Sequence, residues 1–105
     1  MIRMDIFAHE ALELPLREAL AAVPEGSLKG EGKEGQPFTL FRQVAGRGSS
    51  GSSFADDVWP ESNISMVFFI EDDQEDRFRD AIRDIRQAYP LLGLAVFAAE
   101  GYRTL

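Results

Sequence analysis

The residues with the clearest chemical potential form one glycine-rich run in the middle of the chain, GRGSSG from Gly46 to Gly51. The run has the spacing of a G-x-G-x-x-G dinucleotide fingerprint, but that fingerprint follows a strand and opens a helix, whereas here more serines and then an apolar strand follow. The chemistry that remains is anion binding, because glycines let backbone N–H groups approach a ligand closely and a guanidinium stands between them. The candidate ligand-binding residues are Gly46, Arg47, Gly48 and Ser49.

This run opens a long connection that extends from Gly46 to Asn63. Apolar residues precede it at 37–45 and follow it at 64–70, so it joins two predicted strands, which a simple hairpin would join with only a few residues. Glycine and serine supply few packing contacts, and ordering each residue carries a backbone entropy cost of about 1 kcal/mol. We therefore expect residues 48–62 to be mobile without a ligand and to become ordered when a small anion or a protein partner binds.

Two aromatic side chains in this connection are candidates for contact with a partner. Trp59 is the only tryptophan and precedes Pro60, which biases the Trp59 backbone toward an extended form. Its ring either docks on the body of the domain or is offered to a partner. The candidate partner-binding residues are Phe54 and Trp59.

The sequence offers little for a metal site or for catalysis. The acids of the connection, Asp56, Asp57 and Glu61, lack the spacing of an EF-hand loop. His9 is the only histidine, so imidazole ligands would gather only if symmetry brought several copies together. There is no G-x-S-x-G elbow and no cysteine nucleophile. We therefore predict no metal, no cofactor, no catalytic residue and no enzymatic activity.

The composition is that of one globular domain covering residues 1–105. With 45% hydrophobic and 10% aromatic residues, the chain can form a packed core. A net charge of -7 disfavours nucleic acid and anionic membranes, although Arg42, Arg47 and Arg103 stand apart from the acidic clusters and allow a local anion site. Cysteine is absent and no apolar run approaches the ~20 residues of a membrane span, so we expect a cytoplasmic protein.

The first part of the chain reads as a strand and a helix. Residues 1–9 alternate with the period of two that predicts a strand, whose even-numbered side chains should face a helix layer. Pro15 suits the first turn of the helix that follows, and Pro24 and Gly26 end it. The residues expected to face inward are Ile2, Met4, Ile6 and Ala8 in the strand, and Leu16, Ala19, Leu20 and Val23 in the helix.

The second part reads as two strands, a helix and a last strand. Residues 37–45 alternate imperfectly, which predicts a strand with a bulge near Leu40 and Phe41. Residues 64–70 are apolar on both faces, as in a central strand covered twice. The clearest helix then ends before Pro90, and residues 93–99 alternate as a strand. Its apolar stripe is Phe78, Ala81, Ile82, Ile85, Ala88 and Tyr89, and its expected capping box is Asp72 or Asp73 with Glu75 or Asp76.

This order of elements predicts an α+β fold, a ferredoxin-like βαββαβ sandwich with a four-stranded antiparallel sheet and both helices on one face. The other face would then expose an apolar patch too large for a soluble monomer. A second copy of the same sheet is the simplest cover, so we expect a closed oligomer. The residues expected on this face are Phe7, Val67, Phe69 and Phe97.

The order of elements, the Gly46-Arg47-Gly48 segment at the end of the second strand, and the long connection resemble the PII signal-transduction family over nearly the whole chain. GRGSSG…DDVWPESN, followed by an apolar strand, an acid-capped helix and YPLLGLAVF, is similar to a branch of nitrogen regulatory PII homologues with a G-R-G-x-S-G…VWPE-N pattern. The resemblance implies a homotrimer with its sheets packed inward and a T-loop from Gly48 to Ser62. It also implies a small-molecule site in each cleft between subunits, where PII proteins bind adenine nucleotides.

The resemblance also bears on the site and the partners. Gly46, Arg47 and Gly48 match the strand-end segment whose backbone meets the nucleotide in that family. The family's second phosphate-binding loop, T-G-x-x-G-D-G-K, is replaced here by AYPLLG at residues 88–93, which contains no lysine. The T-loop tyrosine that some members carry for uridylylation is absent. The implied function is a regulatory protein whose T-loop signals to a membrane transporter or an enzyme.

Two other classes of protein share the predicted fold. A trimeric protein for divalent-metal binding or metal tolerance would use His9 and the acids of the connection. A small hydrolase such as acylphosphatase would need a phosphate-binding motif near the N-terminus, which this sequence lacks. The regulatory protein is our leading hypothesis and the metal-binding protein is the alternative.

Overall fold

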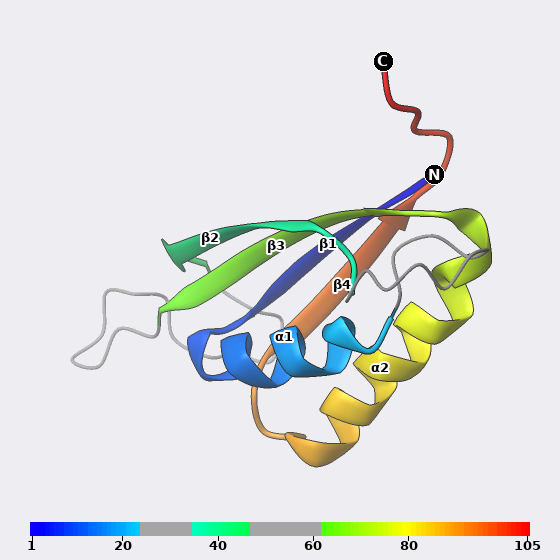
Figure 1. The fold of residues 1–105 in the computed structure, drawn as a ribbon. Coiled ribbons are helices and arrows are strands. Elements are labelled where there is room, and N and C mark those ends of the chain that lie inside the picture. The colour runs from blue at the N-terminus through cyan, green and yellow to red at the C-terminus, as the bar shows by residue number, and fades with distance from the viewer. Residues whose placement is uncertain (24–34, 47–61) are drawn as a thin grey trace.

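The structure is a computed structural model that describes residues 1–23, 35–46 and 62–105. Its elements follow the predicted order, and four antiparallel strands form one sheet in the order β2-β3-β1-β4 with both α-helices on one face (Figure 1). The ferredoxin-like βαββαβ prediction is confirmed. The elements are β1 (Ile2–His9), η1 (Glu10–Leu12), α1 (Glu13–Ala21), β2 (Phe38–Val44), β3 (Asn63–Ile70), η2 (Asp72–Gln74), α2 (Glu75–Ala88) and β4 (Leu94–Ala99).

The core lies between the sheet and the two helices. The even-numbered side chains of β1 are buried, as the alternation predicted, and so are the even-numbered side chains of β3 beside them. The ring of Phe68 on β3 meets the ring of Phe78 on α2 edge to face, with 5.1 Å between centroids. Burial of such side chains is the main favourable contribution to folding. The buried helix residues are Leu16, Leu20, Phe78, Ile82 and Ile85.

Within the described residues, the opposite face of the sheet carries no helix and exposes aromatic rings, as predicted. Phe7 is 45% exposed, Phe69 40% and Phe97 61%, while Val67 on the same face is half-buried. Phe7 and Phe97 meet edge to face at 6.1 Å between centroids. We call this surface the open face of the sheet. Its other aromatic members, which the sequence analysis did not assign to it, are Phe41 of β2 and Tyr102 of the C-terminal segment.

The start of α2 differs from the prediction. A short 3-10 turn, η2, precedes the helix, so Gln74 takes the N-cap position, and neither helical start has a side-chain capping bond. The expected capping box of Asp72 or Asp73 with Glu75 or Asp76 is therefore wrong. The turn closes through its own backbone, because the Gln74 amide donates to the Glu71 carbonyl at 3.0 Å. Asp72 instead lies 3.4 Å from the amino group of Met1.

The predicted bulge near Leu40 and Phe41 is present and lies directly after Phe41, because Phe41 is opposite Ser65 and the next pair in register is Val44 with Asn63. The end of the α2 stripe differs from the prediction. The apolar stripe of α2 ends at Ile85, since Ala88 and Tyr89 are exposed. Neither α-helix in the described part of the chain is long and apolar enough to span a membrane.

Candidate functional site

β2 and β3, the strands on either side of the long connection, adjoin it at the same end of the sheet. β2 ends at Val44, which is paired with Asn63 at the start of β3. β1 ends beside them at His9, also paired with Asn63, and the His9 amide donates to the carbonyl of Gly93, just before β4, at 2.9 Å. One end of each of the four strands lies at this edge of the sheet (Figure 1). We call this place the loop end of the sheet and define it by His9, Gly46, Ser62, Asn63 and Gly93.

Hydrogen bonds fix the backbone at the loop end. The Glu10 amide donates to the Ser62 carbonyl at 3.0 Å, which ties the end of the connection to the start of η1. The His9 Nδ1 atom accepts from the Ala11 amide at 3.0 Å and so caps η1. Metal binding at Nδ1 would displace that amide, and binding at Nε2 would require the neutral ring to carry its proton on Nδ1. Metal coordination by His9 through either nitrogen would therefore break the hydrogen bond from the Ala11 amide that caps η1.

Two features of the loop end bear on ligand binding, an open side at Gly46 and a buried hydroxyl at Ser62. A Cβ atom built at Gly46 would meet, among the described atoms, only Asn63 Nδ2 at 4.0 Å, so a ligand can approach the backbone on that side. The Ser62 Oγ atom is buried and has no hydrogen-bond partner within the described residues. An unpaired buried hydroxyl costs about 1–3 kcal/mol, which a ligand that bonded it would recover. Ser62 was not among the predicted site residues, because the one feature that marks it in the sequence is its position just before a strand.

An ion pair crosses from β2 to α1 beside the loop end. Arg42 donates to both carboxylate oxygens of Glu13, through Nε at 2.7 Å and a terminal nitrogen at 2.8 Å. These hydrogen bonds, helped by a weaker one from Arg17 at 3.4 Å, lower the pKa of Glu13 below its ordinary value. The same pairing raises the pKa of Arg42. Arg42 was one of the three arginines expected to allow an anion site. In the structure it is paired with the Glu13 carboxylate of the same chain.

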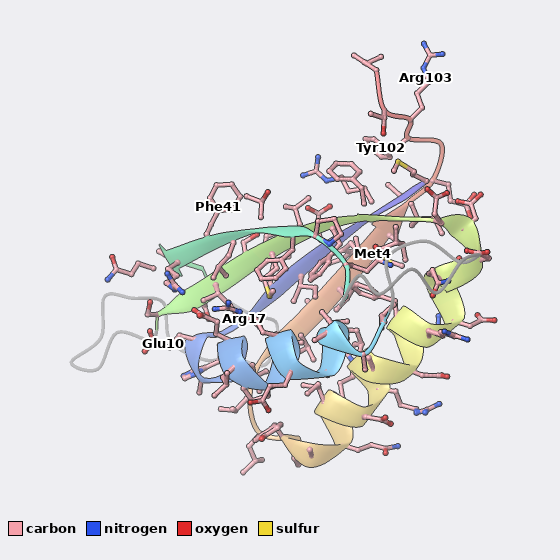
Figure 2. All side chains as sticks on the ribbon, viewed as in Figure 1. Met4, Glu10, Arg17, Phe41, Tyr102 and Arg103 are labelled. Carbon is pink, nitrogen blue, oxygen red and sulfur yellow. The ribbon has the colours of Figure 1, made fainter. Side chains whose placement is uncertain are left out.

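The predicted site residues divide into two groups. Gly46 lies at the loop end, whereas Arg47, Gly48, Ser49, Phe54 and Trp59 lie outside the described residues. The acids of the connection, Asp56, Asp57 and Glu61, lie outside them as well. Arg103 is far from the loop end within one chain, since Figure 2 places it beyond Tyr102, at the opposite end of the molecule from Glu10. Among residues 1–23, 35–46 and 62–105, no group of three or more His, Cys, Asp or Glu side chains could hold a metal ion.

Comparison with known proteins identifies the fold through structure alone. No family model and no curated protein matches the sequence. A PII-like signalling protein from Thermus thermophilus superposes with a TM-score of 0.58 at 17% identity, over 93% of this chain and 83% of that one. The four-stranded sheet with two helices is thus the fold of PII-like signalling proteins.

Two further structures with this fold contain nucleotides. CPII from Thiomonas intermedia K12, bound to ADP and bicarbonate, superposes with a TM-score of 0.65 at 11% identity, over 97% of this chain and 88% of CPII. CPII from the same organism, described as a nitrogen regulatory PII-like protein and bound to ADP, AMP and bicarbonate, gives a TM-score of 0.61 at 13% identity, over 99% of this chain and 94% of CPII. Proteins with this fold therefore include one that binds adenine nucleotides.

Proposed function

We propose that this chain is a PII-like regulatory protein that binds a small anionic molecule, such as an adenine nucleotide, at the loop end of the sheet. The sites lie in clefts between the subunits of a homotrimer, and the long connection carries the signal to a transporter or an enzyme. The protein catalyses no reaction of its own. The observation that carries the proposal is the loop end itself, where four strands of a PII-like sheet meet at the base of a long glycine- and serine-rich connection.

The chemistry at the loop end favours an anion with hydrogen-bonding groups. Gly46 leaves its backbone approachable, and Ser62 supplies a buried hydroxyl that lacks a partner among the described residues. Arg47 follows Gly46 in the chain and adds a positive charge that can form paired hydrogen bonds with a phosphate. CPII, which shares the fold, binds ADP.

One chain supplies few of the groups that a nucleotide needs. The Gly93 carbonyl is already bonded to the His9 amide, and the segment from Ala88 to Gly93 contains no lysine. A neighbouring copy can supply the remaining contacts if the open face of the sheet is an interface between copies. The aromatic rings on that face support this assembly, because a soluble monomer rarely exposes so large an apolar patch.

Isothermal titration calorimetry with ADP, ATP, AMP and bicarbonate tests the proposal. We expect ADP to bind, and we expect Arg47→Ala to weaken binding about ten- to hundredfold, the usual cost of losing a charged hydrogen bond. Arg86→Ala on α2 is the matched control and should bind ADP like the native protein. Absence of binding by all three nucleotides would overturn the proposal, and binding of Cu²⁺ or Zn²⁺ alone would favour the metal-binding alternative.

A further inference from the structure

The last residues of β2 contain a strained bulge. Between the pairs Phe41 with Ser65 and Val44 with Asn63, β2 places two residues, Arg42 and Gln43, opposite Ile64 alone. Gln43 has φ of 58°, the only positive φ of a non-glycine residue in the described part of the chain. Side chains other than glycine are disfavoured in this left-handed region, and such residues persist only where their surroundings hold them. Something must therefore hold Gln43.

The bulge changes the direction of the chain just before the connection. In a regular ladder Gln43 would be opposite Asn63, whereas the extra residue puts Val44 there. Val44 is consequently one position out of phase with the rest of β2, and its side chain lies on the face opposite to the one that a regular ladder would give it. The bulge thus determines how the backbone of Gly46 is presented at the loop end.

Side chains of α1 hold β2 immediately before this position and at the start of the strand. Arg42 forms its two hydrogen bonds with Glu13, the first residue of α1, and Arg17 adds a third contact to the same carboxylate. The Arg17 guanidinium also lies 5.6 Å from the centroid of the Phe38 ring, near the start of β2. Figure 2 shows Arg17 on the helix side of β2 and Phe41 on the other side. The pair of parallel hydrogen bonds fixes Arg42 in both position and orientation.

We propose that Glu13 and Arg42 are positioning residues for the proposed site: their ion pair holds the bulge at Gln43 in its strained form and so fixes the Gly46 end of β2. Breaking the pair lets the bulge relax toward a regular ladder and moves the Gly46 backbone. The effect on ligand binding rests on the function proposed above, whereas the effect on the bulge does not.

Hydrogen exchange of residues 41–46 and 62–65, measured by mass spectrometry, tests the positioning role. We expect Glu13→Gln to raise exchange there several-fold, and Arg42→Lys to act in the same direction, because lysine cannot form the two parallel bonds. Glycine tolerates the left-handed region, so adding Gln43→Gly to Glu13→Gln should restore the native exchange. Glu75→Gln, which breaks an ion pair with Arg79 on the surface of α2, is the control and should change nothing at these residues.

A titration of the same variants with ADP separates this inference from the proposed function. We expect Glu13→Gln to weaken ADP binding about three- to tenfold and the double variant to recover it. Unchanged exchange in Glu13→Gln, or failure of Gln43→Gly to restore it, would overturn the positioning role whatever ADP does. Restored exchange without any binding of ADP to the native protein would support the positioning role and refute the proposed function.

Discussion

The two faces of the sheet have similar side chains and opposite surroundings. On the helix side, the even-numbered residues of β1 and β3 are buried by α1 and α2. On the open face, the odd-numbered residues of the same strands include Phe7 and Phe69, which no helix in the described part of the chain covers (Figure 1). Apolar residues on both faces of the same strands therefore form a buried core on one side and, on the other, the exposed surface that we propose as an interface between copies.

The open face also differs in its polar content. Arg3 donates to both carboxylate oxygens of Asp5, and its guanidinium lies 5.9 Å from the centroid of the Phe69 ring. On the helix side, the buried side chains of the described strands include no charged residue. Arg3 and Asp5 already neutralise each other within one chain, beside the Phe69 ring. Such a pair is compatible with an interface between copies, because neither charge would be buried without a partner.

Phe68→Ala should have the largest effect, because it removes a ring from the centre of the buried face. We expect the free energy of unfolding to fall by about 3–5 kcal/mol, the usual cost of deleting a core phenylalanine. Chemical denaturation monitored by circular dichroism measures this change. Phe97→Ala on the open face is the matched variant. Both variants are measured at a dilution that separates the chains. If Phe68→Ala and Phe97→Ala then lost the same free energy of unfolding, the distinction between a core face and an open face would be wrong.

Phe69→Asp should break the assembly. A charge placed in the covered interface lacks a partner and costs several kcal/mol, so we expect the oligomer to dissociate or the protein to unfold. Light scattering gives the mass, and circular dichroism distinguishes dissociation from unfolding. Leu14→Asp makes the same kind of change at a position of α1 that is 64% exposed and should leave the mass unchanged. A Phe69→Asp protein with the native mass would show that this ring lies outside the interface.

Asp5→Asn should weaken the assembly less than Phe69→Asp does. The substitution leaves Arg3 without its carboxylate partner on the face that a neighbouring copy covers in the proposed trimer. We expect the dissociation constant of the oligomer to rise about fivefold, because the side chains are only partly buried and water still reaches the pair. Analytical ultracentrifugation over a dilution series measures it. An unchanged or lower constant would place the ion pair outside the contact.

The smallest expected effect lies outside both faces, at Glu13. Because the folded state lowers the pKa of Glu13, the carboxylate contributes stability above its unfolded pKa, and that contribution is lost as the pH falls through the lower folded pKa. Glu13→Gln should therefore flatten the acid side of the stability profile and leave its alkaline side unchanged. Thermal melts of the native protein and of Glu13→Gln between about pH 3 and 8, a range that includes the usual pKa of a carboxylate, measure this difference. If both proteins lost stability in parallel as the pH fell, the role assigned to Glu13 would be wrong.

The sequence predicted what depends on local periodicity. The alternation in β1 and β3 and the stripe through Phe78, Ile82 and Ile85 gave the correct faces, because burial repeats with the period of the element. The bulge was predicted only approximately, near Leu40 and Phe41, because the broken alternation of residues 37–45 does not show which residue takes the left-handed backbone conformation. The capping box was wrong because a backbone turn precedes α2 and Asp72 pairs instead with the N-terminal amino group, a contact between residues far apart in the chain.

The candidate site was predicted less completely than the fold. Gly46 lies where the Gly-Arg-Gly run placed it, at the end of the second strand, but its predicted companions from Arg47 to Ser49 and the aromatic residues Phe54 and Trp59 are outside the described residues. Their roles stay predictions. Ser62 was not recognised because an unpaired buried hydroxyl is a property of packing, which no spacing in the sequence reveals.

Native mass spectrometry with and without ADP tests the central claim most directly, since it counts chains and bound nucleotides in the same particle. We predict a species of three chains of 11.7 kDa each that gains up to three ADP molecules, and smaller species without ADP when Phe69 is replaced by Asp. Single chains of 11.7 kDa that bind no ADP at micromolar protein concentration would contradict both the interface assigned to the open face and the site assigned to the loop end.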